Sequence, residues 1–472
     1  MTKRAWMTLT LMLVAAMVSA ASIAAELPRP KPCIEPASEA AASAPVRLAQ
    51  LRYRCLTLRD GQHVLVGEAG AAEARTVLLV HGLGDNAHRD WARVIPALAA
   101  QFHVVTLDLP GFGGSPDAPQ GLSVTGLSAT LADVLDNTAP SQRVHVVGHS
   151  LGAAVSLYFA HAHPTRVDRL ALVDAAGILL KTVFAQHITT LRTPQVGIMS
   201  VDRFLQRLNE RIDGFRRGVF SRLDEGFDLS RWLAQNPGVR RALLGRHTQV
   251  EAALGLMEHD FTSAIRETTA PTTVIWGAND PVAPLRTGTL LAGRMPDARL
   301  KVIYGVGHTP MLESPEVFNR LLLAGLTAPL PQRPVGQAIG ASQGSVVCEN
   351  HPRARYSGEF DSITLDHCDG ARIEGARLKQ LTLKSSSLTI ENTAIDSSDV
   401  ALSAQHSEVI ATNASFRGRV AIRAGHSRLD LAGVTLQASE RGVEMPAPSR
   451  MYFSVSDWHG TDHRGDAHFM YR

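Results

Sequence analysis

The pentapeptide Gly148-His149-Ser150-Leu151-Gly152 decides how this chain of 472 residues folds. An apolar run, Arg143–Val147, precedes it and indicates a buried strand, and the segment Leu151–His161 that follows predicts a helix. A serine between small residues at such a strand-to-helix turn adopts strained backbone angles, and its hydroxyl projects from the sheet edge. The glycine–serine–glycine spacing alone is a weak signal, but this context makes it specific. We therefore expect Ser150 to be a nucleophile.

Strands and helices alternate on both sides of this pentapeptide. Apolar runs typical of strands buried on both faces occur at Thr76–Val80, His103–Leu107, Arg169–Val173, Thr272–Trp276 and Arg299–Tyr304. Helical spacing occurs at Asp90–Gln101 and Thr125–Asn137. This alternation predicts an α/β fold with a mostly parallel sheet. Reactive groups in such folds lie beyond the carboxyl ends of the strands, which is where Ser150 falls.

A base and a carboxylate follow two of the later strands. A serine hydroxyl needs a base at neutral pH, and His308 comes directly after the last predicted strand. Asp280 follows the preceding strand and is expected to orient the imidazole and stabilise its charged form. The order Ser150, Asp280, His308 is the one expected for a nucleophile on this kind of turn. Asp174 ends an earlier strand and is an alternative acid, although a structural or helix-capping role suits it better.

Two backbone amides are expected to bind the oxyanion of a tetrahedral intermediate. One belongs to Leu151, the residue after the nucleophile, and the other to Leu83, in the loop after the first parallel strand. Gly82 lets this loop come close to the nucleophile. His81 suits an orienting or structural role better than a catalytic one.

These segments together resemble the α/β-hydrolase superfamily. The resemblance covers residues 48–326 and is greatest to the branch of esterases, lipases, C–C bond hydrolases and cofactor-free haloperoxidases. It rests on His81-Gly82, Asp108-Leu109-Pro110-Gly111-Phe112-Gly113-Gly114-Ser115, Gly148–Gly152, Trp276-Gly277-Ala278-Asn279-Asp280 and Gly305-Val306-Gly307-His308.

The resemblance implies a role for each residue of the site. Ser150 would be the nucleophile, Asp280 the acid and His308 the base, with no cofactor and no metal. It also implies a helical cap, at about residues 177–265, which shapes the substrate pocket. Epoxide hydrolases and haloalkane dehalogenases carry an aspartate at the nucleophile position, so Ser150 argues against both.

The first 25 residues are expected to be a secretory signal peptide. Lys3 and Arg4 precede an uninterrupted apolar stretch, and small residues follow it. An uncleaved membrane anchor is the alternative, because about 20 apolar residues could span a bilayer. We expect cleavage, export to the periplasm or medium, and no membrane span afterwards. Residues 26–47 then form an N-terminal arm rich in Ala, Pro and Ser.

The charge balance argues against a nucleic-acid partner, and the cysteine content agrees with export. The chain has 47 Lys and Arg against 44 Asp and Glu, a net charge of +3, and lacks a basic run, which argues against a nucleic-acid partner. Four cysteines allow three pairings, of which Cys33–Cys55 and Cys348–Cys368 are the local ones. Four free buried thiols are the alternative, but disulfides persist in an oxidising compartment.

A linker at residues 327–345 leads to a repetitive region at residues 346–472. Ser386–Ile395, Ser407–Phe416 and Ser427–Leu436 align without gaps, with starts 21 and 20 residues apart. A second set, Leu381/Leu383, Val400/Leu402 and Val420/Ile422, keeps the same rhythm, and Ile363/Leu365 and Val443/Met445 would begin and end the stack. Repeats this short must stack to bury their apolar residues. The region resembles a parallel β-helix; a small β-sandwich is the alternative.

Two classes of function follow from this organisation. The first is an exported serine hydrolase that cleaves a small-molecule or lipid-like carboxylic ester through an acyl-enzyme; thioester, lactone, amide and C–C bond hydrolysis would use the same three residues. The second is a non-enzymatic envelope protein that presents the C-terminal region to a polymer on a hydrolase scaffold. In either case we expect the C-terminal region to be non-catalytic, with a polymer or envelope component as its partner.

Overall fold

The computed structural model describes residues 32–35, 51–84, 87–117, 122–179, 248–329, 341–459 and 467–471. The expected signal peptide, most of the N-terminal arm and residues 180–247 of the expected cap lie outside the described residues. In the part of the chain that is described, no helix combines the length and apolarity needed to cross a membrane.

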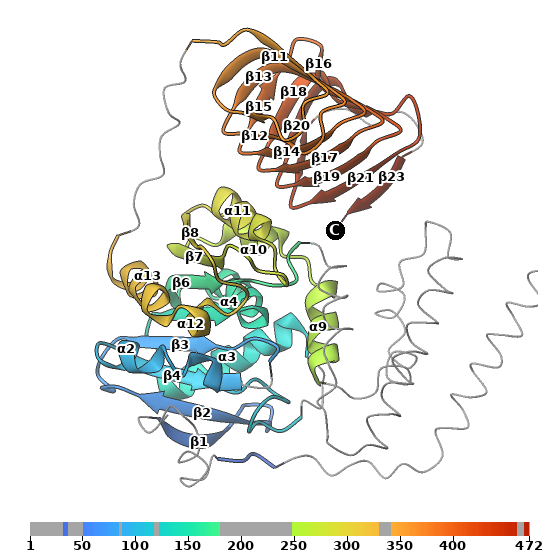
Figure 1. Cartoon of the computed structure of the whole chain (residues 1–472). Coiled ribbons are helices and arrows are strands. Elements are labelled where there is room, and N and C mark those ends of the chain that lie inside the picture. The colour runs from blue at the N-terminus through green and yellow to red at the C-terminus, as the bar shows by residue number, and fades with distance from the viewer. Residues whose placement is uncertain are drawn as a thin grey trace, which may run out of the picture.

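The first part of the chain forms an eight-stranded sheet in the order β1-β2-β4-β3-β5-β6-β7-β8 (Figure 1). Strands β3 to β8 pair in parallel, which confirms the predicted mostly parallel sheet. Its strands are β1 (Arg52–Thr57), β2 (His63–Ala69), β3 (Thr76–Val80), β4 (His103–Leu107), β5 (Val144–His149), β6 (Val167–Val173), β7 (Thr272–Gly277) and β8 (Ala298–Ile303).

Helices cover both faces of this sheet because alternate strand residues point to opposite sides. Leu78 and Val80 of β3 pack in one hydrophobic core with α3, α4 and α9 to α11. Val77 and Leu79 pack in the other with η2, α2, α12 and α13. The helices are η2 (Ala87–Trp91), α2 (Ile95–Ala99), α3 (Val124–Thr138), α4 (Leu151–Ala162), α9 (Thr248–Glu258), α10 (Thr262–Glu267), α11 (Leu285–Arg294), α12 (Pro310–Glu313) and α13 (Pro315–Thr327).

Two local features differ from the sequence-based expectation. The helix predicted over Asp90–Gln101 is broken into η2 and α2, because Pro96 occupies the first turn of α2, where a missing amide hydrogen costs least. The antiparallel strands β1 and β2 were not predicted. They form the sheet edge, where β1 alternates charged and partly buried residues.

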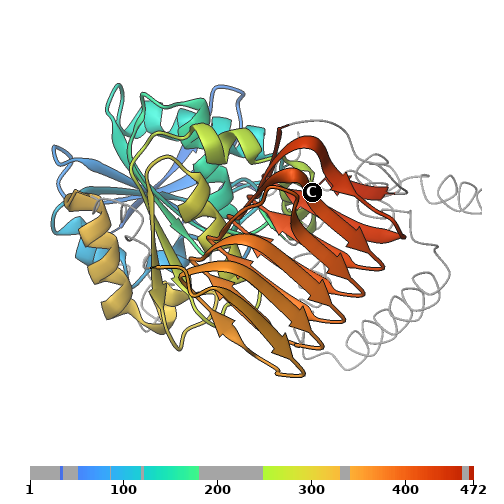
Figure 2. The same cartoon turned by 90° about the horizontal axis from the view of Figure 1, so that it is seen from above.

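The C-terminal residues form two sheets of parallel strands, seen as stacked rows in Figure 2. One has the order β10-β12-β14-β17-β19-β21-β23 and the other β22-β20-β18-β15-β13-β11-β9, with β16 pairing to β13 and β18. The strands are β9 (Ser345–Glu349), β10 (Arg355–Tyr356), β11 (Glu359–Asp366), β12 (Ala371–Glu374), β13 (Arg377–Lys384), β14 (Ser387–Glu391), β15 (Ala394–Asp396), β16 (Val400–Gln405), β17 (Glu408–Thr412), β18 (Ser415–Gly425), β19 (Arg428–Ala432), β20 (Thr435–Glu444), β21 (Ser449–Ser454), β22 (Asp457–His459) and β23 (Ala467–Tyr471).

The three aligned repeats lie directly beside one another. Leu388 pairs with Val409 and Val409 with Leu429, in the predicted register. In the second set, Val400 and Leu402 pair with Val420 and Ile422 in the predicted register. The register of the preceding repeat was predicted wrongly, because Leu381 pairs with Leu402 instead of Val400. The stack also extends beyond its predicted ends, from β9 to β23.

A row of serines joins successive repeats through hydrogen bonds. The Ser386 amide donates to Ser407 Oγ at 3.2 Å, the Ser407 amide to Ser427 Oγ at 3.1 Å, and the Ser427 amide to Ser449 Oγ at 3.2 Å. The hydroxyls of Ser386, Ser407 and Ser427 in turn donate to the carbonyl two residues earlier in their own repeat, at 2.7 to 2.8 Å. The amides at one corner of these three repeats are thus satisfied by the next repeat. We call this row the serine ladder.

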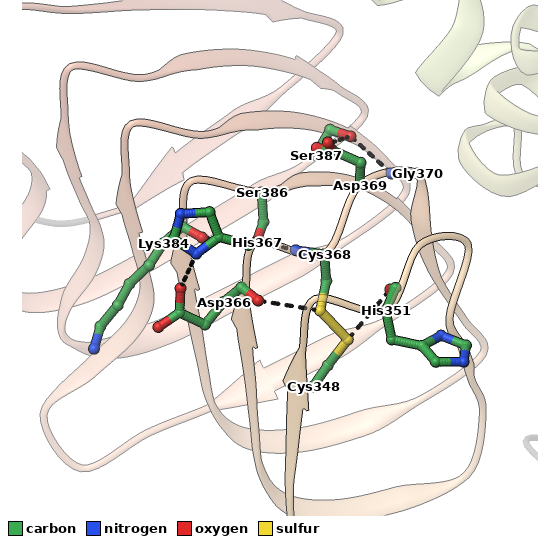
Figure 3. The surroundings of a disulfide bond; sticks show 10 residues. All are labelled: Cys348, His351, Asp366, His367, Cys368, Asp369, Gly370, Lys384, Ser386 and Ser387. Atoms are coloured by element: carbon green, nitrogen blue, oxygen red, sulfur yellow. Dashed lines mark hydrogen bonds and ion pairs between the residues drawn. A yellow bond between two sulfur atoms is a disulfide. The ribbon is translucent and has the colours of Figure 1, made fainter.

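Two disulfides join the predicted local pairs, Cys33–Cys55 and Cys348–Cys368. Figure 3 shows that Cys368 sits at the beginning of the serine ladder, where its amide donates to Ser386 Oγ at 3.0 Å. Its sulfur reaches back to Cys348 in the preceding repeat. The first connection between repeats is therefore covalent.

Helix α11 docks against the C-terminal strands through two arginines. Arg286 Nε donates to Thr412 Oγ1 at 2.7 Å, and its Nη2 donates to the carbonyls of Ala411 and Asp430 at 2.9 and 3.1 Å. Its Nη1 also lies 3.0 Å from Asp430 Oδ1. Arg294 donates to the Gly433 carbonyl and to Thr435 Oγ1.

Apolar contacts extend this interface. Ala432 and Val455, from the C-terminal strands, are buried in the same hydrophobic core as Leu290 of α11. Arg266 of α10 pairs with Asp457 at 2.7 Å. The two parts of the chain therefore share a packed interface in addition to the linker between them.

The buried His145 on β5 makes stability depend on pH. It is 3% exposed and packs against Phe102, and burial lowers its pKa from 6.5 to about 4 despite the nearby Asp168. The unfolded chain takes up this proton at a higher pH than the folded protein does, so the stabilisation is present above about pH 6.5 and is lost as the pH falls towards 4.

We expect the free energy of unfolding to fall across this pH window, and to fall less steeply in His145→Gln. Urea unfolding at several pH values between 4 and 7 measures both slopes. Equal slopes for the native protein and the variant would contradict the assignment.

Candidate active site

Ser150 occupies a sharp turn between β5 and α4. Its backbone has φ 52° and ψ −116°, and its amide donates to the Val173 carbonyl at 2.9 Å. A Cβ on Gly148 would lie 2.3 Å from the Gly152 carbonyl oxygen, and one on Gly152 would lie 2.3 Å from that of Val80. Only glycine therefore allows the strand and helix to approach this closely.

The side chains of Ser150, His308 and Asp280 form one hydrogen-bonded series. His308 Nε2 lies 3.0 Å from Ser150 Oγ, and His308 Nδ1 lies 2.7 Å from Asp280 Oδ2. The three residues come from the ends of β5, β8 and β7, so the parallel sheet brings them to one edge. The serine hydroxyl thus faces an imidazole whose far nitrogen faces a carboxylate.

Backbone amides fix the Asp280 carboxylate. Its Oδ1 accepts hydrogen bonds from the amides of Val282 and Ala283, at 2.7 and 3.0 Å. Burial raises the pKa of Asp280, but the hydrogen bond and charge of His308, together with these two amides, outweigh burial and hold the pKa below its ordinary value. The group is therefore ionised at neutral pH.

Two residues without an assigned role in the sequence-based prediction hold the His308 loop. His149 Nε2 donates to the His308 carbonyl at 2.8 Å. Glu313, in the short helix α12, accepts from the amides of Gly307 and Thr309 at 2.7 and 3.1 Å. His149 is adjacent to Ser150 in sequence and Glu313 follows His308 by five residues, so proximity to the predicted residues was the available signal.

The loop with the predicted oxyanion donor Leu83 lies beside the nucleophile. A Cβ on Gly82 would be 3.1 Å from Ser150 Cβ. His81 fixes this loop, because its Nε2 accepts from the Leu109 amide at 2.9 Å and its Nδ1 donates to the Gly82 carbonyl at 2.6 Å. Leu151, the other predicted donor, begins α4 and is fully buried.

The alternative acid, Asp174, does not take the place of Asp280. It directly follows β6, and its Oδ1 accepts from the Gly277 amide at 2.9 Å. Oxygen and nitrogen atoms of Asp174, Asp280 and His308 lie within 4.8 Å of one another, a spacing that a metal ion could bridge. The 2.7 Å contact between His308 and Asp280 is, however, a hydrogen bond, and it is shorter than the roughly 3.3 Å between two ligands of a tetrahedral zinc ion.

A family match covers the parallel strands of the sheet and the residues at their ends. Residues 75–315 match the alpha/beta hydrolase fold family, and the chain belongs to this family. The match ends before the C-terminal strands begin.

Two of the curated relatives carry the names of hydrolases with different substrates. The 2-hydroxy-6-oxononadienedioate/2-hydroxy-6-oxononatrienedioate hydrolase 2 of Pseudomonas putida is 31% identical, over 53% of this chain and 87% of its own length. The pimeloyl-[acyl-carrier protein] methyl ester esterase of Aeromonas hydrophila is 28% identical, over 52% and 93%. A solved hydrolase from Pseudomonas aeruginosa PA01 is 24% identical and covers 59% of this chain and 99% of its own, with a TM-score of 0.45.

Proposed function

We propose that the protein is an exported serine hydrolase that cleaves a carboxylic ester through an acyl-enzyme. The observation that carries this proposal is the series of hydrogen bonds from Ser150 Oγ through His308 to Asp280. Membership of the hydrolase family supports the reaction class, and a methyl ester esterase among the relatives supports the ester.

The reaction has two halves, and His308 takes up and returns one proton in each half. Ser150 Oγ attacks the ester carbonyl carbon while its proton passes to His308 Nε2. The carbon–oxygen bond to the alcohol breaks, Nε2 returns the proton to the departing oxygen, and Ser150 is left acylated. Water then attacks the acyl group, Nε2 takes its proton and returns one to Ser150 Oγ, and the carboxylic acid leaves. Asp280 stabilises the imidazolium in both halves.

The negative oxygen of each tetrahedral intermediate would bind between two amides. We assign them to Leu151, at the first position of α4, and Leu83, in the loop beside Ser150. The start of a helix favours negative charge, because its amides lack partners within the helix.

The same three residues would also serve a thioester, lactone, amide or C–C bond hydrolase. The dienedioate hydrolases among the relatives keep the last of these classes open. Hydrolysis of p-nitrophenyl esters of graded chain length, compared with matched thioesters and amides, separates these substrates and measures the length of the acyl site.

We also propose how the chain is divided. Residues 1–25 would be a signal peptide, 26–47 an arm, 48–326 the hydrolase domain with a cap at about 177–265, 327–345 a linker, and 346–472 a parallel β-helix. Two disulfides support the export of the protein to an oxidising compartment. Winding between two parallel sheets, with partners 20 to 21 residues apart in the central repeats, supports the β-helix.

A fluorophosphonate probe tests the proposed nucleophile. We expect the native protein to be labelled on Ser150, because the probe reacts with serines activated by a base. Ser150→Ala should lose the label, whereas Ser156→Ala, which removes a buried hydroxyl in the second turn of α4, should keep it. A folded native protein that stays unlabelled would favour the alternative, a non-enzymatic envelope protein that binds a polymer.

A further inference from the structure

Asp174 is a buried carboxyl group that the proposed reaction does not use. It directly follows β6 and is 0% exposed, and its backbone has the left-handed φ of 44°, which is costly for residues other than glycine, asparagine and aspartate. Its Oδ1 accepts the Gly277 amide, as described above. The surrounding fold therefore holds this side chain in one place.

The other oxygen of Asp174 lacks a conventional partner. Oδ2 is buried and, among the described residues, meets neither a backbone amide nor a side-chain donor. An oxygen of the Asp174 carboxyl instead lies within 4.8 Å of an oxygen of the Asp280 carboxyl. Two carboxylates at this distance repel each other, and a buried acceptor without a donor is costly. One proton between them removes both penalties.

We propose that Asp174 is a neutral carboxylic acid that donates a hydrogen bond from Oδ2 to Asp280 and so positions Asp280 against His308. The inference rests on the proposed function, because it assigns Asp280 as the partner of the base. Asp174 acts through Asp280 and is a positioning residue.

The charges around Asp174 agree with this protonation state. Burial raises its pKa well above the ordinary value, and the negative charges of Asp280 and Glu313 raise it further. The hydrogen bond from the Gly277 amide acts in the opposite direction and is outweighed. His308 faces Asp280 directly through the 2.7 Å contact, so its charge favours ionisation of Asp280 first.

Infrared difference spectroscopy tests the protonation directly. We expect the native protein at pH 7 to have the carbonyl stretch of a protonated carboxyl group, and Asp174→Asn to lose it. Asp297→Asn, which removes an exposed carboxylate paired with Arg299, should change ionised bands only. This measurement does not depend on turnover, so it remains informative if the proposed function fails. A native spectrum without a band assignable to Asp174 would overturn the proposal.

Two substitutions separate a neutral donor from a merely structural side chain. Asparagine tolerates positive φ and can accept from the Gly277 amide while donating to Asp280, so Asp174→Asn should keep the fluorophosphonate labelling rate within about threefold. Asp174→Gly relieves the backbone but loses both hydrogen bonds, so labelling should slow about tenfold or more. Thermal unfolding verifies that both variants are folded. Equal slowing in both folded variants would overturn the proposal.

Discussion

Asp280→Asn is expected to lower kcat/KM for a p-nitrophenyl ester by a factor on the order of 10⁴, with the fold intact. The carboxylate accepts the hydrogen of His308 Nδ1 at 2.7 Å, so Nε2 is free to take the serine proton. An amide can donate to Nδ1 instead and thereby place the hydrogen on Nε2, where it faces Ser150 Oγ. The imidazole then has no free lone pair towards the nucleophile. It also lacks the negative charge of the Asp280 carboxylate, which stabilises the protonated imidazole.

Steady-state kinetics, with circular dichroism to verify folding, measures this effect. The matched control is Asp297→Asn, the same chemical change at an exposed carboxylate before β8, which should keep native kinetics. A folded Asp280→Asn protein that retains more than about a tenth of the native kcat/KM would contradict the role assigned to this carboxylate.

Arg286→Ala is expected to cost about 2–4 kcal/mol of unfolding free energy. The guanidinium of Arg286 joins α11 to two C-terminal strands, because it donates to Thr412 Oγ1 on β17 and to carbonyls of both strands. Asp430, 3.0 Å away and largely covered, would lose its partner. Truncation therefore leaves several polar groups of the interface unsatisfied.

Urea unfolding of the full chain measures this loss. Arg417→Ala is the control, since Arg417 also pairs with neighbouring repeats but its side chain lies exposed on β18, so we expect a change below about 1 kcal/mol. Equal losses in the two variants would show that the interface contributes no more than a surface contact.

The sequence predicted the strands that carry the site better than the contacts that hold it. Buried parallel strands are continuous apolar runs, so their ends, and with them Ser150, Asp280 and His308, could be located. The bonds from His149 and Glu313 to the His308 loop join a side chain to backbone groups. Such bonds leave no periodic pattern, and only the folded loop reveals them.

The edges of each sheet were the least predictable parts. Strand β1 alternates exposed charges with half-buried residues, a weaker pattern than the apolar run of β3. In the C-terminal sheets the spacing between partners changes from 17 residues at Ala371 and Leu388 to 22 at Leu429 and Met451, whereas the central repeats keep 20 or 21. A fixed period therefore identified the centre of the stack and missed its ends.

The interface between α11 and the C-terminal strands could not be predicted from the sequence for a different reason. Arg286 and Arg294 lie on the same helix as buried leucines, and an arginine in an amphipathic helix ordinarily indicates a solvated face. Here both guanidinium groups instead donate hydrogen bonds to backbone carbonyls of the C-terminal region. Contacts between segments more than 120 residues apart depend on how complete sheets pack, which a local pattern does not encode.

The serine ladder makes the C-terminal region modular. Each serine hydroxyl of the ladder accepts a hydrogen bond from the amide of the preceding repeat, and each serine amide donates to the hydroxyl of the following repeat. Removal of one whole repeat therefore leaves its two neighbours able to form the same hydrogen bond with each other. The Cys348–Cys368 link lies at the N-terminal end of the ladder, where the Cys368 amide already donates to Ser386 Oγ and the sulfur of Cys368 makes the connection to the preceding repeat. Relatives of this protein could therefore differ in the number of whole repeats in the stack, while α11 keeps the repeats that it contacts in place.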